Sequence, residues 1–306
     1  MLQEQIARYK SLDFFARQTV EGFIAGRHSS PFHGFSAEFS DHRQYNTGES
    51  TRNIDWRLYA RTDKLFVKQF QEETNLRCQL LIDHSSSMLF PMERQGDFDH
   101  PNKLTFSILA AAVLVELLHR QRDAFGLSLL SAGIEQYIPA RSNEAHRQHI
   151  FGVLDKLLDD SVTESLSHTT DLPEALHLTA EQLHRRSLVI LFTDALVSPF
   201  EPFLDALRHL RHNKHEVILF HTLHHDRELS LDYEARPYRF IDLETGKQLK
   251  LNPAEIADTY SRQMHERQAA LQQHALSYRI DYQPVDVALG FHQVILPFLL
   301  KRSKHM

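Results

Sequence analysis

Short apolar runs alternate with amphipathic stretches along most of the chain after residue 76. Five runs have the length and composition of strands: CQLLID at 78–83, AFGLSLLSA at 124–132, SLVILFTDA at 187–195, HEVILFHTL at 215–223 and YRIDYQPVDV at 278–287. The stretches between them that favour helices lie at 104–121, 145–158, 172–185 and 201–212. Strands that alternate with helices predict a doubly wound α/β fold, in which a mostly parallel sheet is covered on both faces.

The first 75 residues have a different pattern. Residues 2–25 have helical spacing that ends at Gly26, whereas 27–75 mix turn residues, aromatics and charges until KLFVKQF alternates like a strand. We therefore expect two parts. Residues 1–75 form an N-terminal helix followed by strands and loops, and residues 76–306 form the α/β body. We expect the first part to pack on the body.

The α/β body contains an expected insertion near 226–276. The segment RPYRFIDLETGKQLKL predicts a hairpin, with Thr245 and Gly246 at its turn. Asn252 then offers a capping side chain, followed by Pro253 in the first turn of a helix. The insertion is thus predicted to be a hairpin followed by a helix.

Composition and charge exclude several classes of protein. The chain has 306 residues, of which 42% are hydrophobic and 24% charged, and its net charge of −6 argues against a nucleic-acid partner. A single cysteine, Cys78, excludes an internal disulfide and fits a reducing compartment. The most apolar segment, 104–119, is too short for a membrane span and carries Glu116. We expect a cytoplasmic protein without membrane insertion.

Oxygen-bearing side chains follow the strands of the predicted sheet. Asp83, Ser85 and Ser87 leave the first strand, Thr170 precedes a helix that begins near Asp171, and Asp194 ends the strand LVILFTD. In an open α/β sheet, the carboxyl ends of the strands form the ligand-binding edge. Two carboxylates and three hydroxyls are hard ligands suited to Mg²⁺. Residues two apart in an extended segment share a side, so Ser85 and Ser87 are expected to meet one ion together.

This combination of motifs resembles the metal-ion-dependent adhesion site of von Willebrand factor type A domains. The resemblance implies that the sheet is of that kind. It places Asp83, Ser85, Ser87, Thr170 and Asp194 in the positions of ligands to Mg²⁺ or Mn²⁺. The segment HTTDLPEAL departs from the pattern, because His168 and Thr169 stand where glycines often precede the threonine. Thr169 is therefore the alternative to Thr170.

The segment from Gly26 to Phe70 resembles the signature of a bacterial family of unknown function, number 58. The matching residues are Gly26, His28, Ser30, Glu38, Phe39, Arg43, Tyr45, Arg52, Ile54, Asp55, Trp56, Ala60, Arg61, Val67, Lys68 and Phe70. The usual G-D-D reads Gly48-Glu49-Ser50 here. The resemblance implies a protein-binding adaptor rather than an enzyme. It would work with a MoxR-type AAA+ ATPase in the assembly or maturation of other proteins.

Two other functions remain as alternatives. Asp83 at the end of a strand is also how haloacid-dehalogenase-like phosphohydrolases present a nucleophile, but Ser85 stands where their second aspartate acts as general acid. His221, His224, His225 and Asp226 could instead hold a transition metal. No H-E-x-x-H motif supports the second alternative, and histidines at strand ends more often serve as surface or capping groups.

Overall fold

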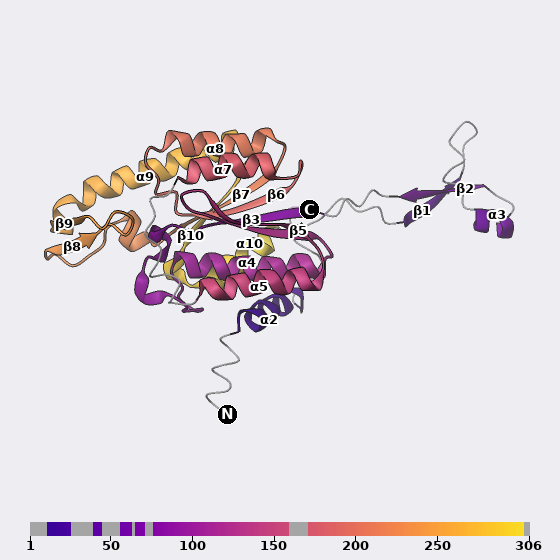
Figure 1. The fold of residues 1–306 in the computed structure, drawn as a ribbon, viewed down its shortest axis with the longest axis horizontal. Coiled ribbons are helices and arrows are strands. Elements are labelled where there is room, and N and C mark those ends of the chain that lie inside the picture. Colours follow the sequence, from indigo (N-terminus) through magenta and orange to yellow (C-terminus); the bar gives the residue numbers. More distant parts are fainter. Residues whose placement is uncertain are drawn as a thin grey trace, which may run out of the picture. The chain divides into compact units, whose positions relative to one another are not determined.

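The computed structural model describes residues 11–25, 39–44, 56–62, 65–70, 76–158 and 171–302. A six-stranded sheet with the order β10-β7-β6-β3-β4-β5 forms its centre (Figure 1). The strands are β3 (Arg77–Asp83), β4 (Ala124–Leu130), β5 (Ile134–Arg141), β6 (Leu188–Thr193), β7 (Glu216–Leu223) and β10 (Asp281–Asp286). All neighbours pair in parallel except β4 and β5, which pair antiparallel. The prediction of a mostly parallel α/β sheet is confirmed.

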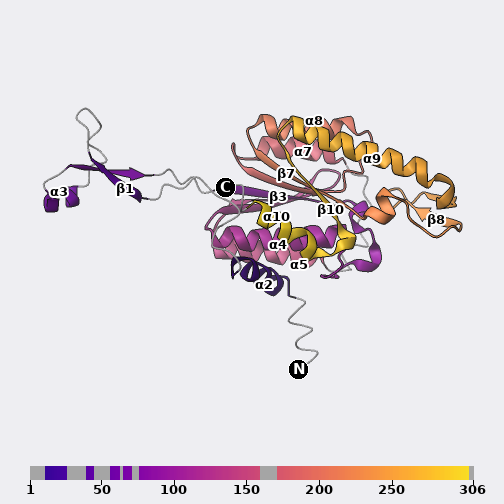
Figure 2. The same cartoon turned by 180° about the vertical axis from the view of Figure 1, so that it is seen from behind.

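Helices cover both faces of this sheet, and the two views agree on which helix lies on which face (Figure 1, Figure 2). One face carries α2 (Leu12–Ala25), α4 (Lys103–Arg120), α5 (Glu144–Leu157) and α10 (Phe291–Arg302). The other face carries α7 (Leu172–Gln182), α8 (Glu201–His212) and α9 (Pro253–Ser277). Because both faces are covered, the central strands are apolar along their length, and Leu80, Leu81 and Ile82 are fully buried.

Helix α4 is buried on nearly all sides, from Lys103 to Leu118. It lies between the sheet and the helices α2, α5 and α10, which explains a sequence that is apolar all round. Its first turn is closed by Asn102, whose side chain accepts a hydrogen bond from the Thr105 amide at 2.7 Å. This cap fixes where the helix begins at the carboxyl edge of the sheet.

Helix α2 belongs to the α/β body. The buried guanidinium of Arg147 on α5 donates to Asp13 of α2 at 2.5 Å, to Glu116 of α4 at 3.3 Å and to Glu144 at 2.9 Å. The chain accordingly divides into one unit made of Met1–Phe32 with Arg77–Met306 and a second unit at His33–Leu76. The helix that the sequence pattern grouped with 27–75 therefore groups with the sheet.

The unit at His33–Leu76 contains a two-stranded antiparallel sheet. Strand β1 (Phe39–Gln44) pairs with β2 (Phe66–Phe70), and helix α3 (Trp56–Thr62) lies between them in the chain. The strand expected at KLFVKQF is thus present. The packing of residues 27–75 on the α/β body stays a prediction.

The insertion after β7 has the predicted content. The π-helical segment η4 (His225–Leu229) is followed by the hairpin β8 (Tyr238–Ile241) and β9 (Gln248–Leu251), and then by α9. Gly246 has φ +68, which suits the turn. The Asn252 side chain caps α9 by accepting from the Ala254 amide. Three short 3-10 turns complete the described elements: η2 (Ser86–Leu89), η3 (Met92–Arg94) and η5 (Val287–Leu289).

The short helix α3 lies in a stretch that the sequence predicted to be strands and loops. Two longer elements were also not predicted from the sequence, β5 and α10. Both contain a proline, Pro139 in the strand and Pro297 in the helix, and proline ordinarily argues against either element. Strand β5 tolerates Pro139 because it lies at the edge of the sheet, where one side of the strand has no ladder partner.

A candidate metal site at the carboxyl edge of the sheet

The site lies where the strand order of the sheet reverses. The chain passes from β3 to β4 on one side, and later returns to β6 on the other side of β3. Connections that leave in opposite directions open a crevice at the carboxyl ends of the two strands. Asp83 is the last residue of β3, and Asp194 directly follows β6. The sheet therefore brings together two acids that are far apart in the sequence, as expected.

Asp83 is buried and held by two neighbouring segments. Its Oδ1 accepts from the Ser85 amide at 3.1 Å, and its Oδ2 accepts from the Thr193 hydroxyl at 2.6 Å. Burial, and then the negative charge of Asp194, raise the pKa of this carboxyl to about 6. A buried acid beside a second acid is stabilised in its charged form by a cation.

Ser85 and Ser87 meet as predicted, although the local geometry differs from the expected one. Their hydroxyl oxygens are 3.1 Å apart, and the Ser87 hydroxyl also hydrogen-bonds to Asp194. We expected an extended segment, but Ser86–Leu89 form the 3-10 turn η2, and only Ser85 before it is extended. The turn, rather than the alternation of a strand, places the two hydroxyls on the same side.

A buried lysine lies beside these groups. The fully buried ammonium of Lys103 donates to Asp194 Oδ2 at 2.7 Å and to Glu228 Oε1 at 2.5 Å. Burial alone would raise the pKa of Asp194, but the ammonium outweighs it and lowers that pKa below its usual value. Burial raises the pKa of Glu228, and Lys103 only partly offsets this. Asp194 is therefore ionised and already carries one positive partner.

The second predicted loop is only partly accounted for. Thr170 and its alternative Thr169 lie outside the described residues. The neighbouring Asp171 caps α7 by accepting from the Glu174 amide at 3.3 Å. The role of the threonine as a ligand therefore stays a prediction.

The histidines near the end of β7 make other contacts. His221 is held between the Tyr282 hydroxyl at 2.8 Å and the Asp194 carbonyl oxygen at 2.9 Å, and burial lowers its pKa to about 4. His225 pairs with Asp286. Across the described parts of the chain, no group of three or more His, Cys, Asp or Glu side chains could hold a metal ion. His221 instead supports the loop that carries Asp194.

A family model described as "Protein of unknown function DUF58" matches residues 41–275, which is more than half of the chain. The chain belongs to this family. The match includes Asp83, Ser85, Ser87 and Asp194, so all the described candidate ligands lie within the part that defines DUF58.

Proteins similar to this chain occur in mycobacteria. The uncharacterized protein Mb1516 of Mycobacterium bovis is 23% identical over 260 residues, which are 84% of this chain and 76% of the relative. The uncharacterized protein Rv1480 of Mycobacterium tuberculosis matches to the same extent.

Among solved structures, this DUF58 chain is similar to the conserved hypothetical protein BatB from Bacteroides thetaiotaomicron. The TM-score is 0.47 at 16% identity, and the match covers 75% of this chain and 99% of the other. Proximal thread matrix protein 1 from the mussel byssus matches with a TM-score of 0.32 at 18% identity, over 49% of this chain and 38% of the other. Among the described helices of the DUF58 chain, none is both long and apolar enough to cross a membrane.

Sequence reasoning missed three residues of the DUF58 site, namely Thr193, Lys103 and Glu228. Lys103 carried a usable signal, because it is the first residue of a helix whose middle is a long apolar run. A cation is disfavoured at the positive end of a helix, so a buried lysine there requires carboxylates nearby. Glu228 carried no comparable signal, since it lies in the insertion, 125 residues further along the chain.

Proposed function

We propose that this protein is a metal-dependent protein-binding module of the von Willebrand factor type A kind, and that it works in the cytoplasm as an adaptor for a MoxR-type AAA+ ATPase. The observation that carries the proposal is the meeting of Asp83, Ser85, Ser87 and Asp194 at the carboxyl edge. Buried oxygen ligands at a strand-order reversal favour a small ligand or ion at this position.

The residues at the edge fit a divalent cation in their chemistry. Two carboxylates and two hydroxyls form one connected group, and every donor atom is oxygen, as Mg²⁺ and Mn²⁺ prefer. The raised pKa of Asp83 reports a negative charge that lacks sufficient compensation. Lys103 compensates Asp194 instead, with its ammonium 2.7 Å from Oδ2. We therefore assign Asp83, Ser85, Ser87 and Asp194 as metal ligands, with Thr170 as a fifth.

A recognition role follows from how these ligands are placed. A bound Mg²⁺ would offer a coordination position to a carboxylate of a partner protein. Ser87 is half-exposed, whereas Asp83, Ser85 and Asp194 are buried, so the site opens toward solvent on the Ser87 side. The residue two positions after Asp83, where haloacid-dehalogenase-like phosphohydrolases carry their general acid, is Ser85. This supports a binding module over a phosphohydrolase.

Calorimetric titration with Mg²⁺ tests the metal assignment. We expect wild type to bind with modest affinity, because neutral hydroxyls make up half of the described ligand set. We expect Asp83→Ala not to bind, because it lacks one of the two carboxylate ligands. Asp171→Ala is the matched control, since this aspartate caps α7 and is not assigned as a ligand. Equal binding by wild type and Asp83→Ala, or no binding by either at millimolar Mg²⁺, would refute the assignment.

Co-purification with the MoxR-type ATPase of the same cells tests the partner. We expect the ATPase to be retained in Mg²⁺ and lost both with chelator and in Asp83→Ala. Retention that is indifferent to metal would contradict metal-dependent recognition, and retention of no AAA+ protein in any condition would contradict the choice of partner.

A further inference from the structure

A cavity of about 630 Å³ opens beside Ser87, at the solvent side of the proposed metal site. Its walls come from the loop after β3, the loop after β6, the hairpin β8–β9 and helix α9. The size is that of a site for a small molecule or a large side chain. Because Ser87 belongs to both, whatever occupies the cavity lies next to the metal position.

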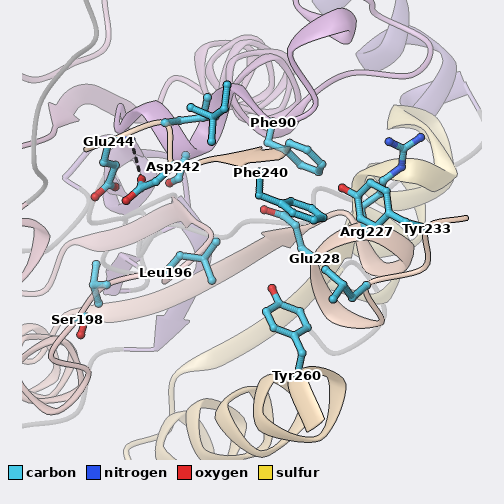
Figure 3. A pocket seen from close by; sticks show the side chains of 15 residues that line it. Phe90, Leu196, Ser198, Arg227, Glu228, Tyr233, Phe240, Asp242, Glu244 and Tyr260 are labelled. Atoms are coloured by element: carbon cyan, nitrogen blue, oxygen red, sulfur yellow. Dashed lines mark hydrogen bonds between the residues drawn. The ribbon is translucent and has the colours of Figure 1, made fainter. Parts of the chain in front are cut away.

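Aromatic rings form much of the wall. Phe90, Tyr233, Phe240 and Tyr260 line the cavity (Figure 3). Tyr233 meets Phe240 edge to face, with the ring centroids 5.4 Å apart. Ring faces attract cations, most strongly where water is partly excluded.

Carboxylates outnumber cations among the lining residues. Glu228, Asp242 and Glu244 line the cavity, against Arg227. The Arg227 guanidinium lies over the Tyr233 ring at 5.2 Å, and the Glu228 carboxylate is bound by Lys103. Hydrogen bonding from Thr245 lowers the pKa of Asp242, so this acid is charged at neutral pH. Figure 3 shows Asp242 and Glu244 together on one side of the cavity. The turn of the hairpin therefore contributes two acidic side chains to the cavity wall.

We infer that this cavity binds an arginine or lysine side chain of a partner protein, next to the acidic side chain of the same partner that reaches the metal. The inference deepens the proposed function and rests on it for the metal contact. Ring faces and carboxylates are together the groups that recognise a cationic side chain. An acidic side chain would meet the carboxylates of Asp242 and Glu244 here. A purely apolar side chain would make no ion pair with Asp242 or Glu244.

Panning of a phage-displayed random peptide library on the full-length protein in Mg²⁺ tests this inference. We expect the enriched peptides to carry an arginine or lysine together with an aspartate or glutamate. The consensus peptide, synthesised with a fluorophore, then gives the affinity by anisotropy. Enriched peptides without a basic residue overturn the inference, and so does a library that yields no binder.

Two cavity variants separate a cation from an apolar occupant. Tyr260→Leu keeps an apolar wall but removes the ring face, and we expect it to weaken the consensus peptide roughly three- to thirty-fold. Glu244→Gln keeps the shape but removes a charge, and we expect a loss of about two- to five-fold. The matched controls are Tyr278→Leu and Glu234→Gln, which do not line the cavity and should leave affinity unchanged.

The same peptide distinguishes the cavity from the metal. Binding that falls in Tyr260→Leu and Glu244→Gln but survives chelator and Asp83→Ala supports the cavity and overturns the metal-dependent function. Binding that requires metal but is unchanged in both cavity variants overturns the cavity inference and supports the metal-dependent function.

Discussion

Replacement of Lys103 by methionine tests the charge arrangement on which the site depends. The side chain is fully buried, and its ammonium lies 2.7 Å from Asp194 and 2.5 Å from Glu228. Methionine has a similar length and preserves the packing in α4, but it leaves two buried carboxylates without their cation. Asp83, whose pKa is already raised by burial and by Asp194, adds a third acid nearby.

The expected loss follows from the cost of an uncompensated buried charge. Removing one partner of a buried ion pair costs about 3–5 kcal/mol of the free energy of unfolding. For a body of this size the loss corresponds to a decrease in Tm of roughly 6–20 °C. A second change, Glu228→Gln, removes one of the orphaned carboxylates. The double variant should therefore be more stable than Lys103→Met alone.

Urea denaturation at neutral pH with chelator present measures these differences. The control is Lys156→Met, because Lys156 is an exposed lysine of α5 and its replacement should change stability by less than about 0.5 kcal/mol. Added Mg²⁺ should restore Lys103→Met more than it stabilises wild type, because the ion no longer shares Asp194 with an ammonium. At a free concentration of 100 times Kd the gain is about 2.7 kcal/mol.

Either of two results would refute this prediction. If Lys103→Met without metal unfolds at the same urea concentration as wild type, the ammonium does not compensate the two acids. If it is destabilised but gains nothing extra from Mg²⁺, the acids do not form the metal position.

Two further outcomes follow from the structure. The folded pKa of Asp83 is about 6, raised from 3.8. Its ionisation therefore costs almost nothing below pH 3.8 and costs about 3 kcal/mol once the pH has risen through 6. Without metal, Asp83→Asn should gain stability over wild type as the pH rises from 4 to 8, and a difference that stays constant across urea titrations in this range would contradict the shift. Gly126→Ala should cost roughly 1–3 kcal/mol or more, because the added Cβ would stand 2.5 Å from the Ile138 carbonyl oxygen and would also meet Gln79. Gly152→Ala on α5 is its control, since nothing lies within 4 Å of the added carbon there; equal melting temperatures for the two variants would contradict the prediction.

The sequence by itself determined five of the six strands of the sheet and the position of the acids. Strands covered on both faces must be apolar along their whole length, so runs such as CQLLID and LVILFT could be recognised without the structure. Asp83 and Asp194 end such runs, and the carboxyl ends of parallel strands share one edge, so their meeting followed from the pattern alone.

Local propensity could not determine the elements at the margins of the fold. Strand β5 and helix α10 contain Pro139 and Pro297, which argue against a strand and a helix in the sequence. The edge position that allows Pro139 in β5 is visible only in the tertiary structure. The meeting of Ser85 and Ser87 was predicted, but the turn that produces it was not.

Only the tertiary structure decided which charges compensate the acids. Lys103 lies 91 residues from Asp194 and 125 residues from Glu228, and no periodic pattern relates positions so distant. The three meet because α4 begins at the edge where β6 ends and because the insertion after β7 folds back to the same place. Because these groups are buried, they must form ion pairs: an ammonium or a carboxylate removed from water is stable only beside a group of opposite charge.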